Sequence, residues 1–229
     1  MIIGIVGSMG AGKDTIADYL TTIHNFRRES FASSLKDSVS AIFGWDRTLL
    51  DGRTKTARDW REQPDNWWAT RLSIPQLTPR WVLQNFATDL CRNHFHQDIW
   101  IASLEHRLSK SEDNIVITDC RFPNEFDSIK RMGGKIIRVS RGPAPAWHSH
   151  VSAALSGDST SKSILNQYGV HESEWAWYGL VCDVIIENNG TIDDLYTNLN
   201  MFINPELDPP ASTISLPDVV SVDSWRTLF

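Results

Sequence analysis

Short apolar runs alternate with longer stretches of helical periodicity along this chain. The runs fall at residues 2–6, 30–31, 115–117, 136–139 and 184–186, and the last three are rich in β-branched residues, as strands buried on both faces of a sheet are. Between them, residues 13–23, 34–43, 80–95, 99–108, 124–132 and 192–202 carry apolar side chains at helical spacing. The alternation predicts an α/β fold with a doubly wound, mostly parallel five-stranded sheet.

Local signals support two of these helix boundaries. Gly133-Gly134 predicts a helix end just before the strand at 136, because glycine adopts the backbone conformation that ends helices. Thr191, followed by two aspartates, predicts a helix start.

Two stretches interrupt the alternation. Residues 46–79 are rich in charge and tryptophan, and residues 141–178 mix glycine, proline, serine and histidine without a clear period. Each is far longer than the roughly 2–6 residues of an ordinary connection. We therefore interpret both as functional insertions within one domain that spans residues 1–203. Residues 204–229 contain four prolines, and we interpret them as a tail without chemistry of its own.

Composition narrows the class of protein. The 229 residues include 22 basic and 28 acidic side chains, a net charge of -6, which does not suit a protein whose main partner is duplex nucleic acid. No apolar run is long enough for a membrane-spanning helix, and the start of the chain lacks the basic region of a secretory signal. Three cysteines without CxxC spacing argue against a disulfide framework or a cysteine zinc site. We therefore expect a cytoplasmic protein that binds small molecules.

The segment GSMGAGKDT at residues 7–15 follows the first strand and opens a helix, as a GxxxxGK phosphate loop does. Its glycines permit conformations closed to other residues, so that successive N–H groups and the helix dipole face phosphate oxygens. Lys13 would bridge the outer phosphates. Asp14 stands where Ser or Thr is usual, and its carboxylate is a candidate Mg²⁺ ligand. The alternative is a plain glycine turn before a helix.

A second cluster follows the strand at 115–117. Asp119 lies at the carboxyl end of that strand, the edge where open α/β sheets bind ligands. It is a candidate to orient a metal-bound water or a substrate hydroxyl, and Arg121 is a candidate phosphate ligand through its planar fork. The alternative is an aspartate that caps the next helix beside an exposed arginine.

On the helix at 80–95, Arg80, Gln84 and Thr88 share one face. This stripe fits either a nucleotide cleft or a solvated surface. Lys36 and Arg53 are further candidate phosphate contacts, or ordinary surface charges. The many tryptophans of this region are expected to pack, although one could stack on a base. The pair His148 and His150 indicates a metal site only weakly, because no further ligand follows at zinc spacing.

Taken in order, these motifs resemble the deoxynucleoside monophosphate kinases of bacteriophages. The resemblance is carried by GKDT at 12–15, Arg80-x-x-x-Gln84 with Ala87-Thr88-Asp89, Thr118-Asp119-x-Arg121 with Glu125, and Asn188-Asn189-Gly190, and it spans roughly residues 1–203. Two positions depart from the family: Ala87-Thr88 replaces the usual Gly-Thr, and Trp81 replaces a basic residue.

The resemblance implies a P-loop nucleoside monophosphate kinase with a substrate-side insertion at 46–79 and a lid at 141–178. The implied reaction transfers the γ-phosphoryl of ATP to a dNMP in the presence of Mg²⁺, with Lys13, Asp119, Arg121 and Arg80 as catalytic residues. The residues that would bind ATP and the metal are Gly10, Ala11, Gly12, Lys13, Asp14, Thr15, Asn188 and Gly190. The residues that would bind the dNMP are Leu35, Lys36, Arg53, Arg80, Gln84, Ala87, Thr88, Trp100, Asp119, Arg121 and Glu125.

Arg138 and Arg141, at the start of the lid, are candidates to close over the transferred phosphate. A phage-encoded kinase of this type would act in the host cytoplasm, and a homodimer is compatible with the sequence. Three alternatives stay open: a kinase of dephospho-coenzyme A, a kinase of a modified base in phage DNA, and an ATP-binding switch without catalysis.

Overall fold

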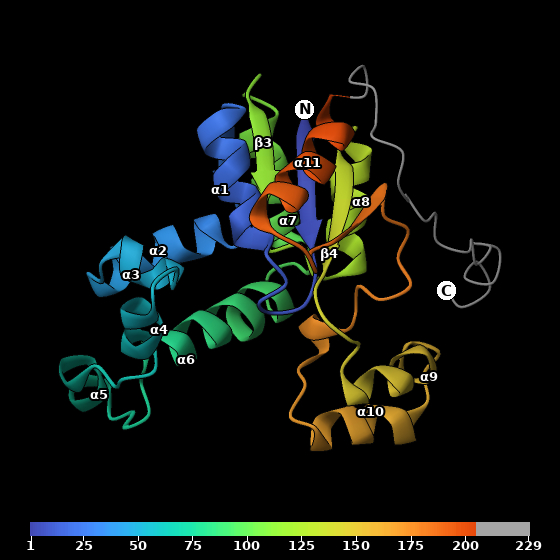
Figure 1. The fold of residues 1–229 in the computed structure, drawn as a ribbon. Helices are drawn as coiled ribbons and strands as arrows, with labels where there is room; N and C mark the ends of the chain where they lie inside the picture. Colours follow the sequence, from blue (N-terminus) through green and yellow to red (C-terminus); the bar gives the residue numbers. More distant parts are fainter. Residues whose placement is uncertain (205–229) are drawn as a thin grey trace. The chain divides into compact units, whose positions relative to one another are not determined.

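The computed structural model describes residues 1–204, which form two compact units (Figure 1). Unit 1 comprises residues 1–28 and, of the described residues, 113–204. Unit 2 comprises residues 29–112. Nearly all of the tail that we interpreted from the sequence, from residue 205 on, lies outside the described residues. Within residues 1–204 no helix has the length and apolar character needed to cross a membrane.

A five-stranded sheet forms the centre of unit 1. Its strands are β1 (Ile2–Val6), β2 (Phe26–Glu29), β3 (Asn114–Ile117), β4 (Lys135–Ser140) and β5 (Val184–Glu187), in the order β2-β3-β1-β4-β5. The central strand β1 pairs in parallel with both β3 and β4, and β4 pairs in parallel with β5. The predicted α/β class and parallel sheet are confirmed, and the carboxyl ends of these strands lie at one edge.

The second strand is not where the apolar pattern placed it. Residues 30–31 were predicted as the strand, but β2 covers Phe26–Glu29, with Phe26 and Glu29 buried and Arg27 exposed. An edge strand with two consecutive arginines carries little apolar signal, and Arg27 pairs with Asp113 at 2.9 Å. Phe31 is buried outside the strand, which explains the misplaced prediction.

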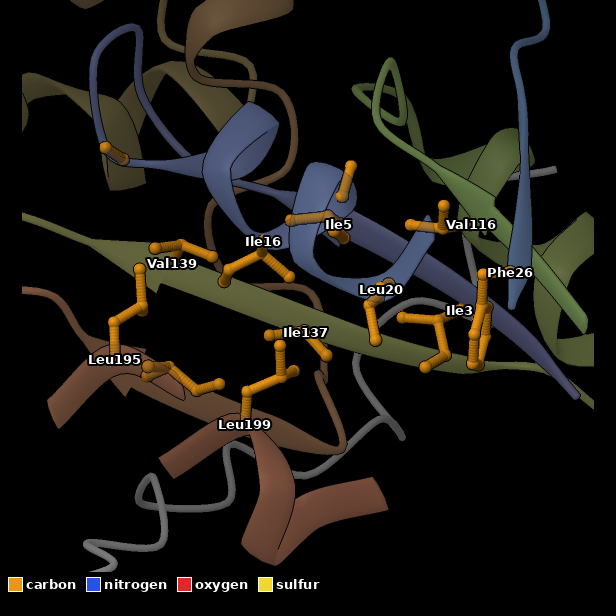
Figure 2. Packing of buried hydrophobic residues seen from close by; sticks show 13 residues of the cluster. Ile3, Ile5, Ile16, Leu20, Phe26, Val116, Ile137, Val139, Leu195 and Leu199 are labelled. Carbon is orange, nitrogen blue, oxygen red and sulfur yellow. The ribbon is translucent and has the colours of Figure 1, made fainter. Parts of the chain in front are cut away.

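Helices cover both faces of the sheet in unit 1. Helices α1 (Lys13–Ile23) and α11 (Ile192–Ile203) pack on the face that carries the alternate residues Ile3, Ile5, Ile137 and Val139 (Figure 2). Helix α8 (Pro123–Arg131) packs on the opposite face, where a Cβ at Gly4 would lie 2.5 Å from Ile129 Cδ1. The bare backbone of β1 at Gly4 therefore allows α8 to approach closely.

Both predicted helix boundaries are confirmed. Helix α8 ends before Gly133, whose φ is +74° and whose N–H donates to the carbonyl of Lys130 at 2.9 Å. Thr191 caps α11, because its hydroxyl accepts a hydrogen bond from the N–H of Asp194 at 3.2 Å.

Residues 141–178 fold as short helical pieces: η2 (Ala146–His150), α9 (Val151–Leu155), α10 (Ser159–Gln167) and η3 (Glu172–Glu174). They have a small core of their own, made of Val151, Ala154, Leu165 and Trp175. This core explains how the segment folds although its sequence has no clear periodicity.

Unit 2 is helical. It contains α2 (Ser33–Phe43), α3 (Arg47–Asp51), α4 (Lys55–Arg61), α5 (Asn66–Leu72), α6 (Pro79–Asn85), η1 (Phe86–Asn93) and α7 (Ile99–Leu108). Its core consists of Leu35, Val39, Trp45, Leu50, Leu77, Val82 and Trp100.

The predicted single helix over 80–95 changes character part-way along. It begins as an α-helix and continues from Phe86 as a π-helix, in which backbone hydrogen bonds span five residues. The carbonyl of Ala87 also accepts a hydrogen bond from Trp100 Nε1 at 3.2 Å.

Candidate active site

The loop between β1 and α1 has the backbone that a phosphate cradle needs. Gly7, Gly10 and Gly12 all have positive φ, at +154°, +78° and +110°. A Cβ at Gly7 would lie 2.2 Å from the carbonyl oxygen of Val139, and one at Gly12 would lie 2.5 Å from Asn188 Nδ2. Gly7 and Gly12 are therefore required both by their backbone conformation and by the atoms that pack closely against them.

The start of α1 is left open to an anion. Its N-cap is Gly12, and within the described chain no side chain caps it, so the first-turn N–H groups point out of the helix without helical partners. The helix dipole adds to this attraction for negative charge. The open N–H groups favour an anion such as a phosphate, and binding of a nucleotide at this loop stays a prediction.

Lys13 is held at the centre of this cradle. Its Nζ donates to the carbonyls of Gly7 at 2.7 Å and Ser8 at 2.8 Å, which directs the ammonium group over the loop. Burial lowers the pKa of Lys13, and the positive charge of Arg121 lowers it further, while Glu174 and Asp14 act in the opposite direction. Partial desolvation strengthens the attraction of such a group for a phosphate.

Asp14 has a partner that the sequence reasoning missed. Arg28, near the end of β2, forms an ion pair with Asp14 and also donates to Asp18 at 3.1 Å and to the hydroxyl of Thr118 at 3.1 Å. Only 15% of the Arg28 side chain is exposed, against 78% for Asp14. Arg28 thus compensates the extra negative charge of Asp14 and connects α1 to the end of β3. The sequence signal that could have indicated this partner is the pair of consecutive arginines, Arg27 and Arg28, in the edge strand β2.

The donor set around the loop suits magnesium more than zinc. Asp14 and Thr15 place a carboxylate and a hydroxyl in the first turn of α1, and magnesium in phosphate sites typically takes one or two protein oxygens together with phosphate oxygens and water. In residues 1–204 no group of three or more His, Cys, Asp or Glu side chains could enclose a metal ion. His148 and His150 therefore remain without the cluster that a zinc site needs.

The second predicted cluster lies just after β3. Asp119 follows the carboxyl end of this strand, as expected, and is partly buried. Arg121 Nη1 donates to Glu174 Oε1 at 2.6 Å and to Ser173 Oγ at 3.0 Å, so the arginine binds the end of the 141–178 segment. Neither Ser173 nor Glu174 was singled out from the sequence.

Glu125 has a structural task that its sequence position did not reveal. It is buried, with 4% of its surface exposed, and its Oε2 accepts hydrogen bonds from the N–H groups of Arg121 at 2.8 Å and Phe122 at 3.1 Å. The carboxylate caps the start of α8 and fixes the backbone of Arg121. A direct contact of Glu125 with substrate stays a prediction.

The late Asn188-Asn189-Gly190 segment supports the loop directly. Asn188 Nδ2 donates to the carbonyl of Ala11 at 2.9 Å, while the N–H of Asn188 donates to the carbonyl of Ser140 at 2.7 Å. Asn189 Oδ1 accepts from the N–H of Gly142 at 2.7 Å, and Gly190 is exposed. Asn188 thus positions the phosphate loop, and contact of Asn188 or Gly190 with ATP remains a prediction.

Arg138 faces aromatic rings of unit 1. Its guanidinium carbon lies 5.2 Å from the ring centroid of Trp177 and 5.0 Å from that of Tyr178. Arg141 is exposed. The predicted role of both arginines over a transferred phosphate stays a prediction, because aromatic packing already accounts for the position of Arg138.

Unit 2 holds the remaining predicted substrate residues, and the structure divides them into two groups. Leu35 and Trp100 are buried in the core of the unit and pack there, and Ala87 lies against the same core. Polar side chains form the other group: Lys36, which pairs with Asp51 at 3.0 Å, Arg80, which pairs with Glu62, and the exposed residues Arg53, Gln84 and Thr88. The polar group is the one whose chemistry suits a nucleotide ligand.

Comparison with known proteins assigns the chain to a family. A profile of the deoxynucleotide monophosphate kinases matches residues 70–199, which is 130 of the 229 residues. The chain belongs to the deoxynucleotide monophosphate kinase family. The matched range of this family includes Arg80, Asp119, Arg121 and Asn188, whereas the phosphate loop precedes it and rests on the geometry described above.

Two viral relatives agree with this membership. A protein of Acanthamoeba polyphaga mimivirus, named for deoxynucleotide monophosphate kinase activity, is 27% identical over 213 residues, which cover 87% of this chain and 94% of the relative. The deoxynucleoside-5'-monophosphate kinase of Escherichia phage T5 is 26% identical over 179 residues, which cover 57% of this chain and 72% of the relative. The resemblance inferred from the motifs is thereby confirmed.

Solved structures are more distant. Shikimate kinase from Aquifex aeolicus is 12% identical with a TM-score of 0.43, covering 90% of this chain and 98% of that one. Dephospho-CoA kinase from Campylobacter jejuni is 16% identical with a TM-score of 0.43, covering 89% and 96%. These similarities are too low to inform the site of this kinase family member.

Proposed function

We propose that this member of the deoxynucleotide monophosphate kinase family transfers the γ-phosphoryl group of ATP to the phosphate of a deoxynucleoside monophosphate. An oxygen of the acceptor phosphate forms a bond to the γ-phosphorus, and the bond from that phosphorus to the β–γ bridging oxygen breaks, which yields a dNDP and ADP. The observation that carries the proposal is the glycine loop with Lys13 at its centre, in a chain of this family.

The phosphate loop of unit 1 would bind ATP. The N–H groups at the start of α1 and the Lys13 ammonium would hold the β- and γ-phosphates and offset the charge that moves to the leaving oxygen. Mg²⁺, held with the help of Asp14 and Thr15, would supply further positive charge at the phosphates. Arg28 keeps the Asp14 carboxylate in place, so that its negative charge is partly balanced before ATP arrives.

Asp119 and Arg121 would act at the transferred group. Asp119 stands at the carboxyl edge of the sheet, where it can order water or a substrate hydroxyl. Arg121 would provide a planar fork for phosphate oxygens, and its ion pair with Glu174 holds the side chain in position. The two phosphate groups that react are both negatively charged, so positive side chains must offset their repulsion. Phosphoryl transfer is catalysed mainly by positioning these groups and stabilising their charge.

The acceptor nucleotide would be recognised by the polar residues of unit 2. Lys36, Arg53 and Arg80 carry positive charge for its phosphate, while Gln84 and Thr88 offer an amide and a hydroxyl for the sugar or the base edge. The three cysteines are all free, and we propose that the enzyme works in a reducing compartment such as a host cytoplasm.

A direct assay tests the function. The protein is mixed with ATP, Mg²⁺ and each of the four common dNMPs, and separately with dephospho-coenzyme A, and the products are resolved by chromatography. We expect a dNDP and ADP in equal amounts. Lys13→Ala should abolish the product, whereas Lys55→Ala, at an exposed lysine on α4, should not. ATP binding without transfer to any dNMP would refute the proposal, and phosphorylation of dephospho-coenzyme A would replace it.

A further inference from the structure

Two arginines of α4 reach back to the end of α3 and to the loop that follows it in unit 2. Arg58 Nη1 donates to the carbonyls of Gly52 at 3.3 Å and Arg53 at 3.0 Å. Arg61 Nη1 donates to the carbonyl of Leu50 at 3.4 Å. Arg58 is exposed, whereas Arg61 is half-buried. The two arginines lie three residues apart in α4, and they differ in how well the protein supplies hydrogen-bond partners for their guanidinium groups.

Arg61 carries a charge that the protein leaves poorly compensated. Burial lowers its pKa, and the nearby positive charges of Arg80 and Arg58 lower it further. Glu62 and Asp51 act in the opposite direction, but Glu62 pairs with Arg80, and Asp51 accepts bonds from two other cations. Throughout residues 1–204 no carboxylate forms an ion pair with Arg61, and its buried Nε lacks a hydrogen-bond partner. A half-buried guanidinium in this state calls for an anion.

Gly52 fixes the position of the Arg61 guanidinium. A Cβ at Gly52 would lie 2.2 Å from Arg61 Cζ and 2.2 Å from Nη2, and Gly52 has a φ of +66°. No larger residue fits here without displacing the guanidinium. In the described chain the only hydrogen bond of Arg61 uses Nη1. Nε is buried without a partner, so Nη2 is the donor that a ligand can reach.

We propose that Arg61 binds the phosphate of the acceptor nucleotide, with Arg80 beside it, an inference that rests on the proposed function. The Nη2 group of Arg61 can donate a charge-assisted hydrogen bond to a phosphate oxygen. An incoming phosphate supplies the missing negative charge. It also repels the Glu62 carboxylate, which frees Arg80 to bind the same group.

A structural role would look different. An arginine that donates to the carbonyls at the end of a helix can stabilise that helix end without contacting any ligand. Arg58, three residues earlier in α4, does this at the loop after α3 with two shorter bonds. Arg58→Gln is therefore the matched control for a purely structural effect.

The test measures binding of dNMP to the intact protein by calorimetry, without ATP, for the wild type, Arg61→Gln, Arg61→Lys and Arg58→Gln. The corresponding deoxynucleoside, which lacks the phosphate, serves as a second ligand. Melting temperatures of all variants are recorded. In parallel, KM for ATP and for dNMP are determined in the transfer assay.

We expect Arg61→Gln to raise the dissociation constant for dNMP by roughly ten- to hundredfold, as the loss of a charged hydrogen bond implies. Deoxynucleoside binding and KM for ATP should stay within about threefold of wild type in the same variant, because neither involves this phosphate. Arg61→Lys should recover part of the affinity, since it restores the charge without the planar fork. Arg58→Gln should leave dNMP binding within about threefold.

Equal effects of Arg61→Gln and Arg58→Gln on dNMP binding would overturn the proposal. A loss in melting temperature for Arg61→Gln with unchanged dNMP affinity would do the same, as would absence of dNMP binding by the wild type. If the wild type binds dNMP through Arg61 but transfers no phosphoryl group, the proposed function fails and the binding role of Arg61 stands.

Discussion

Gly10 and Gly12 of the phosphate loop offer a matched pair of substitutions. Both have positive φ, at +78° and +110°, so alanine is strained at either position. They differ in surroundings. A Cβ at Gly12 would lie 2.5 Å from Asn188 Nδ2, whereas among the described residues a Cβ at Gly10 would meet nothing within 4 Å. Gly10→Ala therefore tests backbone conformation alone, and Gly12→Ala tests conformation together with the bond that Asn188 makes to the loop.

The expected costs follow from these contacts. An L-residue held in the left-handed region costs about 1–2 kcal/mol, which applies to both variants. Gly12→Ala also displaces the Asn188 amide, which donates to the carbonyl of Ala11 at 2.9 Å. Loss of that hydrogen bond costs about 1 kcal/mol more. The free energy of unfolding should therefore fall by about 1–2 kcal/mol for Gly10→Ala and by about 2–3 kcal/mol for Gly12→Ala.

The assay is urea denaturation followed by far-ultraviolet circular dichroism, in a double-mutant cycle with Asn188→Ala. In the Asn188→Ala background the amide is already gone, so the extra cost of Gly12→Ala should shrink by about 1 kcal/mol, while the cost of Gly10→Ala stays the same. KM for ATP should rise more for Gly12→Ala than for Gly10→Ala. Equal costs of the two alanines in both backgrounds would refute the close contact between the loop and Asn188.

Three further outcomes follow from the structure. Arg28→Gln should raise KM for ATP several-fold, because it leaves the negative charge of Asp14 without its arginine partner beside the phosphates. Adding Asp14→Asn to the same chain should recover part of the loss. If KM does not recover, the charge argument is wrong. Burial raises the pKa of Cys182 to about 11, so about one thousandth of this thiol is ionised at pH 8. Iodoacetamide should therefore modify the partly exposed Cys91 first, which mass spectrometry of the native protein would show. Earlier modification of Cys182 would count against its burial. ATP and dNMP together should slow protease cleavage within residues 141–178, as a lid requires, and cleavage that nucleotides fail to slow would remove the lid interpretation.

Local sequence signals were sufficient for the elements on either side of the glycine loop. The strand at 2–6 and the helix at 13–23 have the predicted bounds, because an apolar run, a glycine loop and a helical period follow one another without interruption. Gly133 and Thr191 were equally readable, since helix ends are decided by a few neighbouring residues.

Long-range features were harder to predict. The edge strand β2 is half polar, so the apolar run nearby at Phe31 displaced its predicted position. Within the π-helix after Asn85, the Ala87 carbonyl accepts a hydrogen bond from Trp100, thirteen residues along the chain, which local sequence signals do not show. Tertiary packing places Leu35 and Trp100 in the core of unit 2, which the sequence did not show, and their contact with a substrate stays a prediction.

Asp14 shows why residue type alone gave an incomplete account of the site. As a departure from the usual Ser or Thr, it adds a negative charge where phosphates are expected to bind, and the sequence offered no compensation. The fold supplies that compensation from β2, where Arg28 is largely buried and binds Asp14, Asp18 and Thr118 together. A change at either Asp14 or Arg28 is therefore a change to a pair, and its effect on ATP binding depends on which partner remains.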